Sequence, residues 1–109
     1  MWVDLAPARA GDVNKVRPAI IVSNDGANRA VTRLQQGTMT VVPLTTNVTR
    51  VYPFQVLLPA AGSPLPRDSK AQTEQIRAVA YSRIGDRIGR LHAGLMSELE
   101  TALRLQLVL

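Results

Sequence analysis

The chain has 109 residues, enough for one hydrophobic core but too few for two, so we expect one domain spanning residues 1–109. It has no cysteine, a single histidine (His92) and no apolar run near the roughly 18 residues that span a bilayer, which argues against disulfides, zinc sites and membrane insertion and favours a cytoplasmic protein. Its 13 basic residues exceed the 8 acidic ones, and the resulting net charge of +5 favours a polyanionic partner such as nucleic acid.

Short strands separated by turn residues are expected through most of the chain. Strand patterns begin with residues 1–5 and continue over 17–23, 38–44 and 52–58, while 69–80 resembles one strand interrupted by a bend. Segments 6–14, 45–47 and 59–67 have the composition of loops. Ser23, Asn24 and Asp25 favour a helix N-terminus, so a short helical turn is expected there, ending by Asn28 or Arg29.

One amphipathic helix is expected near the C-terminus. From Gly94 onward, Leu95, Leu99, Ala102 and Leu103 recur at spacings of three and four. Several short strands and one terminal helix indicate a mainly β fold, a small and strongly bent β-barrel, rather than a parallel α/β fold.

Two polar segments at strand ends are candidates for a site. Pro18 forces the preceding residue, Arg17, into an extended conformation, so the arginine projects from its loop. Thr45, Thr46 and Asn47 follow a strand. Taken alone, neither segment requires a function. Arg17 could simply be solvated, and Thr45, Thr46 and Asn47 could simply cap a turn.

Together, these segments and others resemble the MazF/PemK toxins in order and spacing over nearly the whole chain. The matching positions are Trp2, Asp4 and Leu5; Gly11, Asp12, Arg17 and Pro18; Ser23, Asn24, Asp25 and Asn28; Val42, Pro43, Leu44 and Thr45; and Asp68, Ser69, Glu74, Gln75, Ile76 and Arg77. The resemblance implies a small SH3-like barrel of five to six strands with a C-terminal helix, as in the MazF, PemK and CcdB plasmid toxins. Members usually carry a few more residues before the position of Trp2, so a shortened first strand is expected.

The activity implied by the resemblance is that of an mRNA interferase, a sequence-specific endoribonuclease that cuts single-stranded RNA without metal or cofactor. The ribose 2′-hydroxyl attacks the adjacent phosphate, which leaves a 2′,3′-cyclic phosphate and a free 5′-hydroxyl. Arg17 and Thr45 are the implied catalytic pair, and both residue types suit phosphoryl transfer because that chemistry depends on positioning and on stabilising charge on the phosphate oxygens.

The general base is left open. A guanidinium stays protonated in proteins and is a poor base, so Asp12 is a candidate helper. His92 is expected to cap or precede the last helix rather than to act in catalysis.

The RNA-binding groove is expected to be lined by polar residues. Glu74 and Gln75 match a polar pair that lies near the substrate in the family, and the remaining candidates are Asp12, Lys15, Ser23, Thr46, Asn47 and Ser69. Ordinary turn chemistry explains each of them equally well. Aromatic residues are few and are expected mostly in the core, so base reading is assigned to the polar groups.

The resemblance also implies a homodimer and a cognate antitoxin, a MazE-like protein whose acidic, partly disordered segment covers Arg17. Two alternatives stay open. A CcdB-like toxin would inhibit gyrase on the same fold, but those proteins rely on a tryptophan near the C-terminus, whereas Trp2 is the only tryptophan here. A catalytically impaired relative would bind RNA without cutting it.

Overall fold

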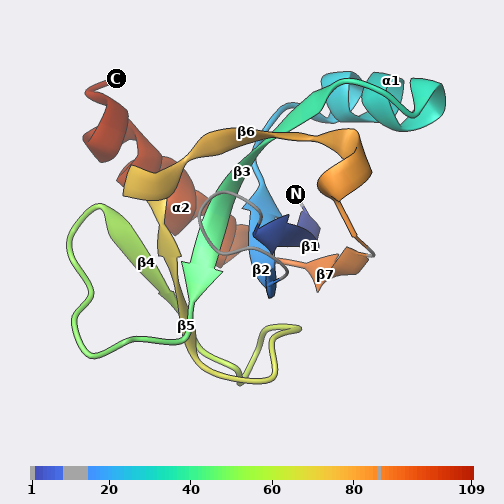
Figure 1. Cartoon of the computed structure of the whole chain (residues 1–109). Coiled ribbons are helices and arrows are strands. Elements are labelled where there is room, and N and C mark those ends of the chain that lie inside the picture. Colours follow the sequence, from blue (N-terminus) through green and yellow to red (C-terminus); the bar gives the residue numbers. More distant parts are fainter. Residues whose placement is uncertain (1, 9–14, 86) are drawn as a thin grey trace.

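The computed structural model describes the backbone of residues 2–8, 15–85 and 87–109, and the side chains of these residues from position 17 onward. The chain folds into seven strands, two α-helices and two short 3-10 helices (Figure 1). In chain order these are β1 (Trp2–Ala8), β2 (Lys15–Ile21), α1 (Asp25–Leu34), β3 (Thr38–Thr45), β4 (Gln55–Leu58), β5 (Ser69–Gln72), η1 (Thr73–Gln75), β6 (Arg77–Ala80), η2 (Tyr81–Arg83), β7 (Arg87–Arg90) and α2 (Ala93–Leu107). Neither α-helix is long and apolar enough to cross a membrane, a finding limited to the residues described.

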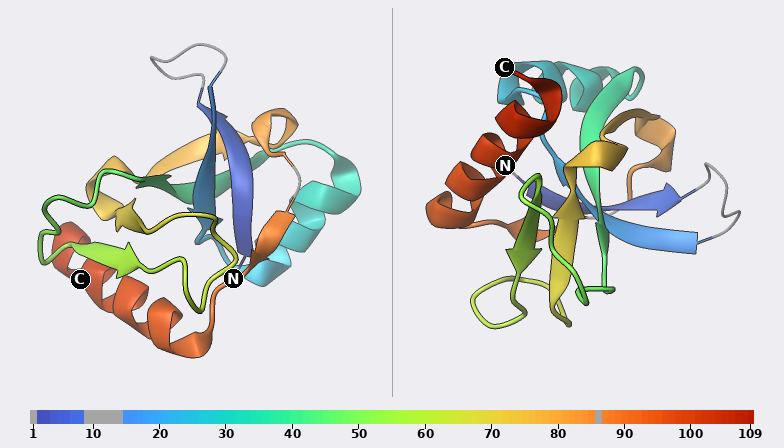
Figure 2. Two further views of the ribbon diagram at one scale, coloured as in Figure 1. Left: turned by 90° about the horizontal axis from the view of Figure 1, so that it is seen from below. Right: turned by 90° about the vertical axis from the view of Figure 1, so that its left-hand side faces the viewer.

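The strands form one antiparallel sheet in the order β4-β5-β3-β2-β1-β7, and β6 pairs separately with β3. The right-hand view of Figure 2 shows that β1 and β2 run in a different direction from β3 and β5, so the sheet bends sharply between β2 and β3. The predicted fold class, mainly β with a C-terminal helix, is confirmed. Within the described part of the chain no pairing joins β4 to β7, so the sheet is open, and it has seven strands rather than five or six.

Several elements differ from the sequence expectation. The helix α1 is not a single turn but has ten residues, and the Asn24 side chain caps it by accepting a hydrogen bond from the Ala27 N–H at 2.7 Å. None of its residues is buried, although Ala27, Ala30, Val31 and Leu34 recur at helical spacings of three and four and Val31 packs against the cluster of Met39 and Val41. The strand β4 begins at Gln55, after Pro53, and the bend expected within 69–80 is the 3-10 helix η1. The strand β7 was not predicted.

The sheet has two faces that differ in what covers them. Alternate residues of a strand point to opposite faces, so Ile20 and Val42 lie on one face and Ala19 and Val41 on the other. The first, the α2 face, is covered by α2, which packs along β4 and η1 (Figure 2, left). Its buried core consists of Ile20, Val42, Leu44, Val56, Leu58, Leu65, Ala71, Leu91, Leu95, Leu99 and Ala102. The second, called the opposite face below, buries a smaller cluster of Ala19, Ile21, Met39 and Val41.

The packing of α2 on the sheet can be tested at Leu99, which is fully buried. We expect Leu99→Ala to lower the free energy of unfolding by about 2–5 kcal/mol, because it removes buried apolar surface and leaves a cavity. Leu105→Ala on the same helix, where the side chain is 56% exposed, should change it by less than about 0.5 kcal/mol. Urea unfolding of both variants measures the difference, and equal effects would show that α2 does not pack as described.

Candidate active site

The site begins where the pairing of β2 with β3 ends. The last paired residues at this end are Ala19 and Pro43. Beyond this last pair, Arg17 lies two residues before Ala19 on β2, and Thr45 lies two residues after Pro43 on β3. Residues two apart in a strand share a face, so both side chains lie on the opposite face, at the same end of the strand pair. The structure therefore brings the predicted catalytic pair to one region of the sheet.

Proline explains why the pairing stops there. Neither Pro18 nor Pro43 has an N–H group to donate to a ladder. Beyond them, Arg17 pairs with Ala6 of β1, while Thr45 pairs with Lys70 of β5. Arg17 thus belongs to the β1–β2 pair and Thr45 to the β3–β5 pair, and these two pairs run in different directions (Figure 2).

The Thr45 hydroxyl is held by the turn that follows it. Its Oγ1 accepts a hydrogen bond from the Asn47 N–H at 3.2 Å, and the Asn47 side chain in turn accepts one from the Thr49 N–H at 3.3 Å. A hydroxyl that accepts one bond keeps its own O–H as a donor. Thr45 can therefore donate to a phosphate oxygen from a fixed position, beside the exposed Thr46 and Asn47.

Lys70 lies next to Thr45 on the same face and was not predicted. Its neighbour Ala71 belongs to the core on the α2 face, so Lys70 points to the opposite face, yet it is only 8% exposed. The Lys70 Nζ donates to the backbone carbonyl of Arg50 at 2.6 Å. This bond holds the β3–β4 loop, residues 46–54, over the sheet beside Thr45.

Glu74 is linked to the same loop. Its Oε2 accepts a hydrogen bond from the Gln55 Nε2 at 2.9 Å, and the Gln55 Oε1 accepts one from the Tyr52 N–H at 3.1 Å. The other carboxylate oxygen of Glu74 is buried and has no hydrogen-bond partner among the described residues. Glu74 thus stabilises the loop through Gln55. Gln75, in contrast, is exposed and accessible to a ligand.

Two predicted groove residues lie away from Arg17 and Thr45. Ser69 is 4% exposed, pairs with Leu58 of the α2-face core and donates its hydroxyl to the Arg67 carbonyl at 3.2 Å. Ser23 is six residues from Arg17, which corresponds to about 20 Å of extended strand. Its hydroxyl donates to the Asn28 side chain at 2.5 Å and accepts from the Thr40 N–H at 3.2 Å, so it is engaged in anchoring the start of α1.

Two further candidates cannot be placed fully. Asp12 lies outside the described residues. Lys15 begins β2, where it pairs with Ala8, but its side chain is outside the described part. Their roles in binding RNA stay predictions.

His92 has the capping role expected for it. It is the N-cap of α2, and its Nδ1 accepts a hydrogen bond from the Leu95 N–H at 3.3 Å. Among the described residues, no group of three or more His, Cys, Asp or Glu side chains is arranged to hold a metal ion.

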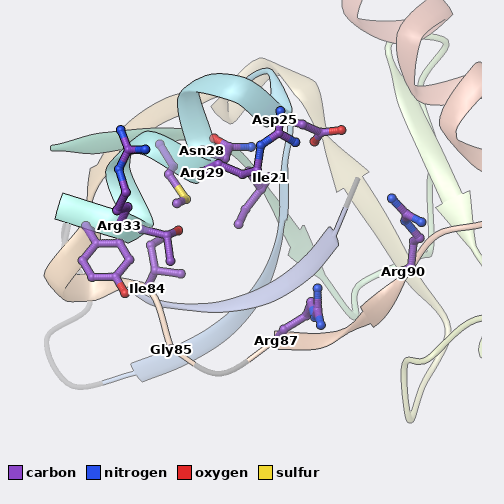
Figure 3. Close-up of a pocket in the computed structure, with 12 residues that line it drawn as sticks. Ile21, Asp25, Asn28, Arg29, Arg33, Ile84, Gly85, Arg87 and Arg90 are labelled. Atoms are coloured by element: carbon purple, nitrogen blue, oxygen red, sulfur yellow. The ribbon is translucent and has the colours of Figure 1, made fainter. Parts of the chain in front are cut away.

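A cavity of about 970 Å³ lies at the other end of the opposite face (Figure 3). Its apolar lining includes Ile21 and Met39 of the strands, and Tyr81 and Ile84 border it. Four arginines from two elements also line it, namely Arg29 and Arg33 of α1 and Arg87 and Arg90 of β7. Arg17 and Thr45 are not among its lining residues. The sequence did not reveal this arginine cluster because β7 was not predicted and α1 was expected to end by Arg29.

A small bent sheet with a C-terminal helix, carrying an arginine and a threonine together at the ends of two strands, agrees with the class of toxin that the motifs indicated. Residues 1–107 match the family model described as PemK-like, MazF-like toxin of type II toxin-antitoxin system. The chain therefore belongs to the MazF/PemK toxin family.

Curated relatives and solved structures agree with this assignment. Endoribonuclease MazF9 of Mycobacterium tuberculosis is 52% identical over 108 residues, covering 98% of this chain and 92% of the relative. Endoribonuclease EndoA of Bacillus subtilis is 29% identical over 109 residues, covering 99% of this chain and 90% of the relative. The structure of a mycobacterial endoribonuclease in complex with its cognate antitoxin superposes with a TM-score of 0.79 at 26% identity, covering 99% of this chain and 92% of that chain.

The anchoring role of Lys70 can be tested by Lys70→Met, which keeps the apolar stem but removes the donor to the Arg50 carbonyl. We expect the free energy of unfolding to fall by about 1–3 kcal/mol and amide exchange in residues 46–54 to accelerate. Arg67→Met is the matched control, because it makes the same loss of a cation at an exposed position outside this loop. Hydrogen exchange measured by mass spectrometry compares the two, and unchanged protection of the loop in Lys70→Met would contradict this role.

Proposed function

We propose that this toxin cleaves single-stranded RNA at a phosphodiester held between Arg17 and Thr45. The observation that carries the proposal is the placement of both residues on one face, at the same end of β2 and β3, each two residues beyond the last pair of the ladder. The names of the relatives support it, since MazF9 and EndoA are both endoribonucleases.

In the proposed reaction the 2′-hydroxyl oxygen attacks the adjacent phosphorus. The bond from phosphorus to the 5′-oxygen breaks, the 2′-hydroxyl loses its proton, and the leaving oxygen gains one. The products are a 2′,3′-cyclic phosphate and a 5′-hydroxyl. Arg17 donates paired, charge-assisted hydrogen bonds to the non-bridging oxygens, where negative charge increases in the transition state.

Thr45 complements Arg17 by fixing the phosphate. Its hydroxyl, held by the Asn47 N–H, donates to the same phosphate group and so orients the reacting atoms. A guanidinium supplies the charge that a metal ion provides in other nucleases, so the proposed reaction is independent of metal. Asp12 is the proposed helper in proton transfer.

The proposed substrate is mRNA in the cytoplasm, recognised in a specific sequence. Thr46 and Asn47 are exposed beside Thr45, and Gln75 is exposed in η1; these three residues and Lys15 are proposed to contact the RNA. The net charge of +5 favours binding of the RNA backbone.

The proposed protein partners are a second copy of this chain and a MazE-like antitoxin, with residues 1–109 acting as one domain. An acidic, partly disordered antitoxin segment would cover Arg17 and compete with RNA for the basic surface. The solved structure of the mycobacterial endoribonuclease in complex with its cognate antitoxin supports this part of the proposal.

A gyrase-inhibiting function is not favoured. The relatives MazF9 and EndoA are both named endoribonucleases.

The proposal is tested by incubating the protein with a long single-stranded RNA in EDTA and mapping the fragment ends. The wild type should give 2′,3′-cyclic phosphate and 5′-hydroxyl ends. Arg17→Ala should lower the cleavage rate by about 10²–10³-fold, because it removes the charged donors of the transition state. Thr45→Ala should lower it as well, and Thr45→Ser should restore much of the loss.

Arg67→Ala, at an exposed position in the β4–β5 loop, is the control and should cleave like the wild type. Binding of RNA without cleavage would identify the impaired relative instead. Inhibition of gyrase without cleavage would identify the CcdB-like alternative. Cleavage that needs added magnesium would contradict the metal-independent reaction.

A further inference from the structure

The β3–β4 loop carries an aromatic pair, in which Tyr52 is exposed and Phe54 is half-buried. The Tyr52 and Phe54 rings stack with their centroids 5.4 Å apart and their planes at 3°. Tyr52 is 42% exposed and Phe54 and Tyr81 are only half-buried, so the expectation that the aromatic residues lie mostly in the core is wrong for the three whose side chains the structure describes. An aromatic ring that remains exposed on a basic protein is a potential stacking surface.

Tyr52 is held rigidly despite its exposure. Its backbone N–H donates to the Gln55 side chain at 3.1 Å, and its carbonyl accepts from the Gln55 N–H at 2.8 Å. The Phe54 carbonyl accepts a hydrogen bond from the buried Thr73 hydroxyl. Because the segment is already ordered, a ligand that stacks on it loses little free energy in ordering the protein.

The ring also lies close to the proposed cleavage site. Lys70, the sheet partner of Thr45, places its Nζ 5.9 Å from the centroid of the Tyr52 ring. Tyr52 therefore lies near the tip of the lysine side chain whose backbone pairs with Thr45. The Arg50 Cζ is 5.7 Å from the same centroid, and its NH1 donates to the Tyr52 hydroxyl at 3.3 Å, so a positive charge adjoins the ring.

We infer that Tyr52 binds a nucleobase of the RNA by stacking, at the nucleotide next to the phosphodiester held by Arg17 and Thr45, with Arg50 beside it to attract the backbone. This inference rests on the proposed function and adds a base subsite to it. Stacking tolerates any base, because every base has a π-face. The subsite therefore supplies affinity and position, while the choice of base depends on polar groups of the loops.

The inference is tested with Tyr52→Ala, Tyr52→Leu and Tyr52→Phe in two assays. Cleavage kinetics use an RNA oligonucleotide that the wild type cuts, and fluorescence anisotropy uses the same oligonucleotide with a 2′-deoxy sugar at the cleaved position. We expect the Ala and Leu variants to raise KM and Kd by about tenfold or more and to change kcat by less than about threefold. The Phe variant, which keeps the ring, should match the wild type.

The outcomes separate this inference from the proposed function. Unchanged KM and Kd in Tyr52→Ala would overturn the subsite while leaving the nuclease intact. A wild type that binds the oligonucleotide but never cuts RNA, with weaker binding by Tyr52→Ala, would support the subsite and overturn the nuclease. A lower kcat at unchanged KM, or loss of binding to an acidic antitoxin peptide with unchanged RNA affinity, would assign Tyr52 another role and overturn the subsite.

Discussion

The end of the β2–β3 ladder at Ala19 and Pro43 is the constraint on which the rest of the site depends. Two prolines without N–H groups stand at or next to this point, and the strands part there to pair with other partners. If the ladder continued, the positions of Arg17 and Thr45 would form part of a regular sheet surface. Because it stops, both residues border the point where β2 and β3 separate to pair with β1 and β5.

The two faces of the sheet divide stability and function between them. The α2 face buries most of the apolar side chains, so it provides the larger part of the hydrophobic free energy. The opposite face has a smaller buried cluster and holds polar and charged groups that a core would exclude. Lys70 is the clearest case, since its buried ammonium group is accommodated by the Arg50 carbonyl that anchors the loop.

The arginine-lined cavity also lies on the opposite face, which holds the polar and charged groups. It opens at the α1 and β7 end of the opposite face, away from Thr45, and gathers four arginines from two elements. The basic charge that the sequence shows only as a total is therefore distributed along the face that carries the site.

Much of the architecture could be predicted from the sequence, because short strands, turn residues and one apolar helix leave clear patterns. The C-terminal helix is visible in the spacing of Leu95, Leu99 and Ala102, and Arg17 and Thr45 stand in recognisable motifs. The full length of α1 was underestimated, although Ala27, Ala30, Val31 and Leu34 recur at helical spacing and could have indicated it. The strand β7 could not be predicted, because its formation depends on pairing with β1, which is far away in the sequence.

The site was predicted less completely for a related reason. A serine in a motif gives no sign of which face it will occupy, and Ser69 proves to be turned into the α2 face. Lys70 and Tyr52 gain their positions only through a loop that folds back on the sheet, which requires hydrogen bonds between residues about 20 apart in sequence. Such contacts have no local pattern.

The most direct test of the account is a double-mutant cycle for Arg17→Ala and Thr45→Ala, with the cleavage step measured under single-turnover conditions. If both groups act on one phosphodiester, their effects are coupled, and the double variant should lose at least about tenfold less than the product of the two single losses. Multiplicative losses, within about twofold, would show that the two side chains act independently and would contradict a shared site.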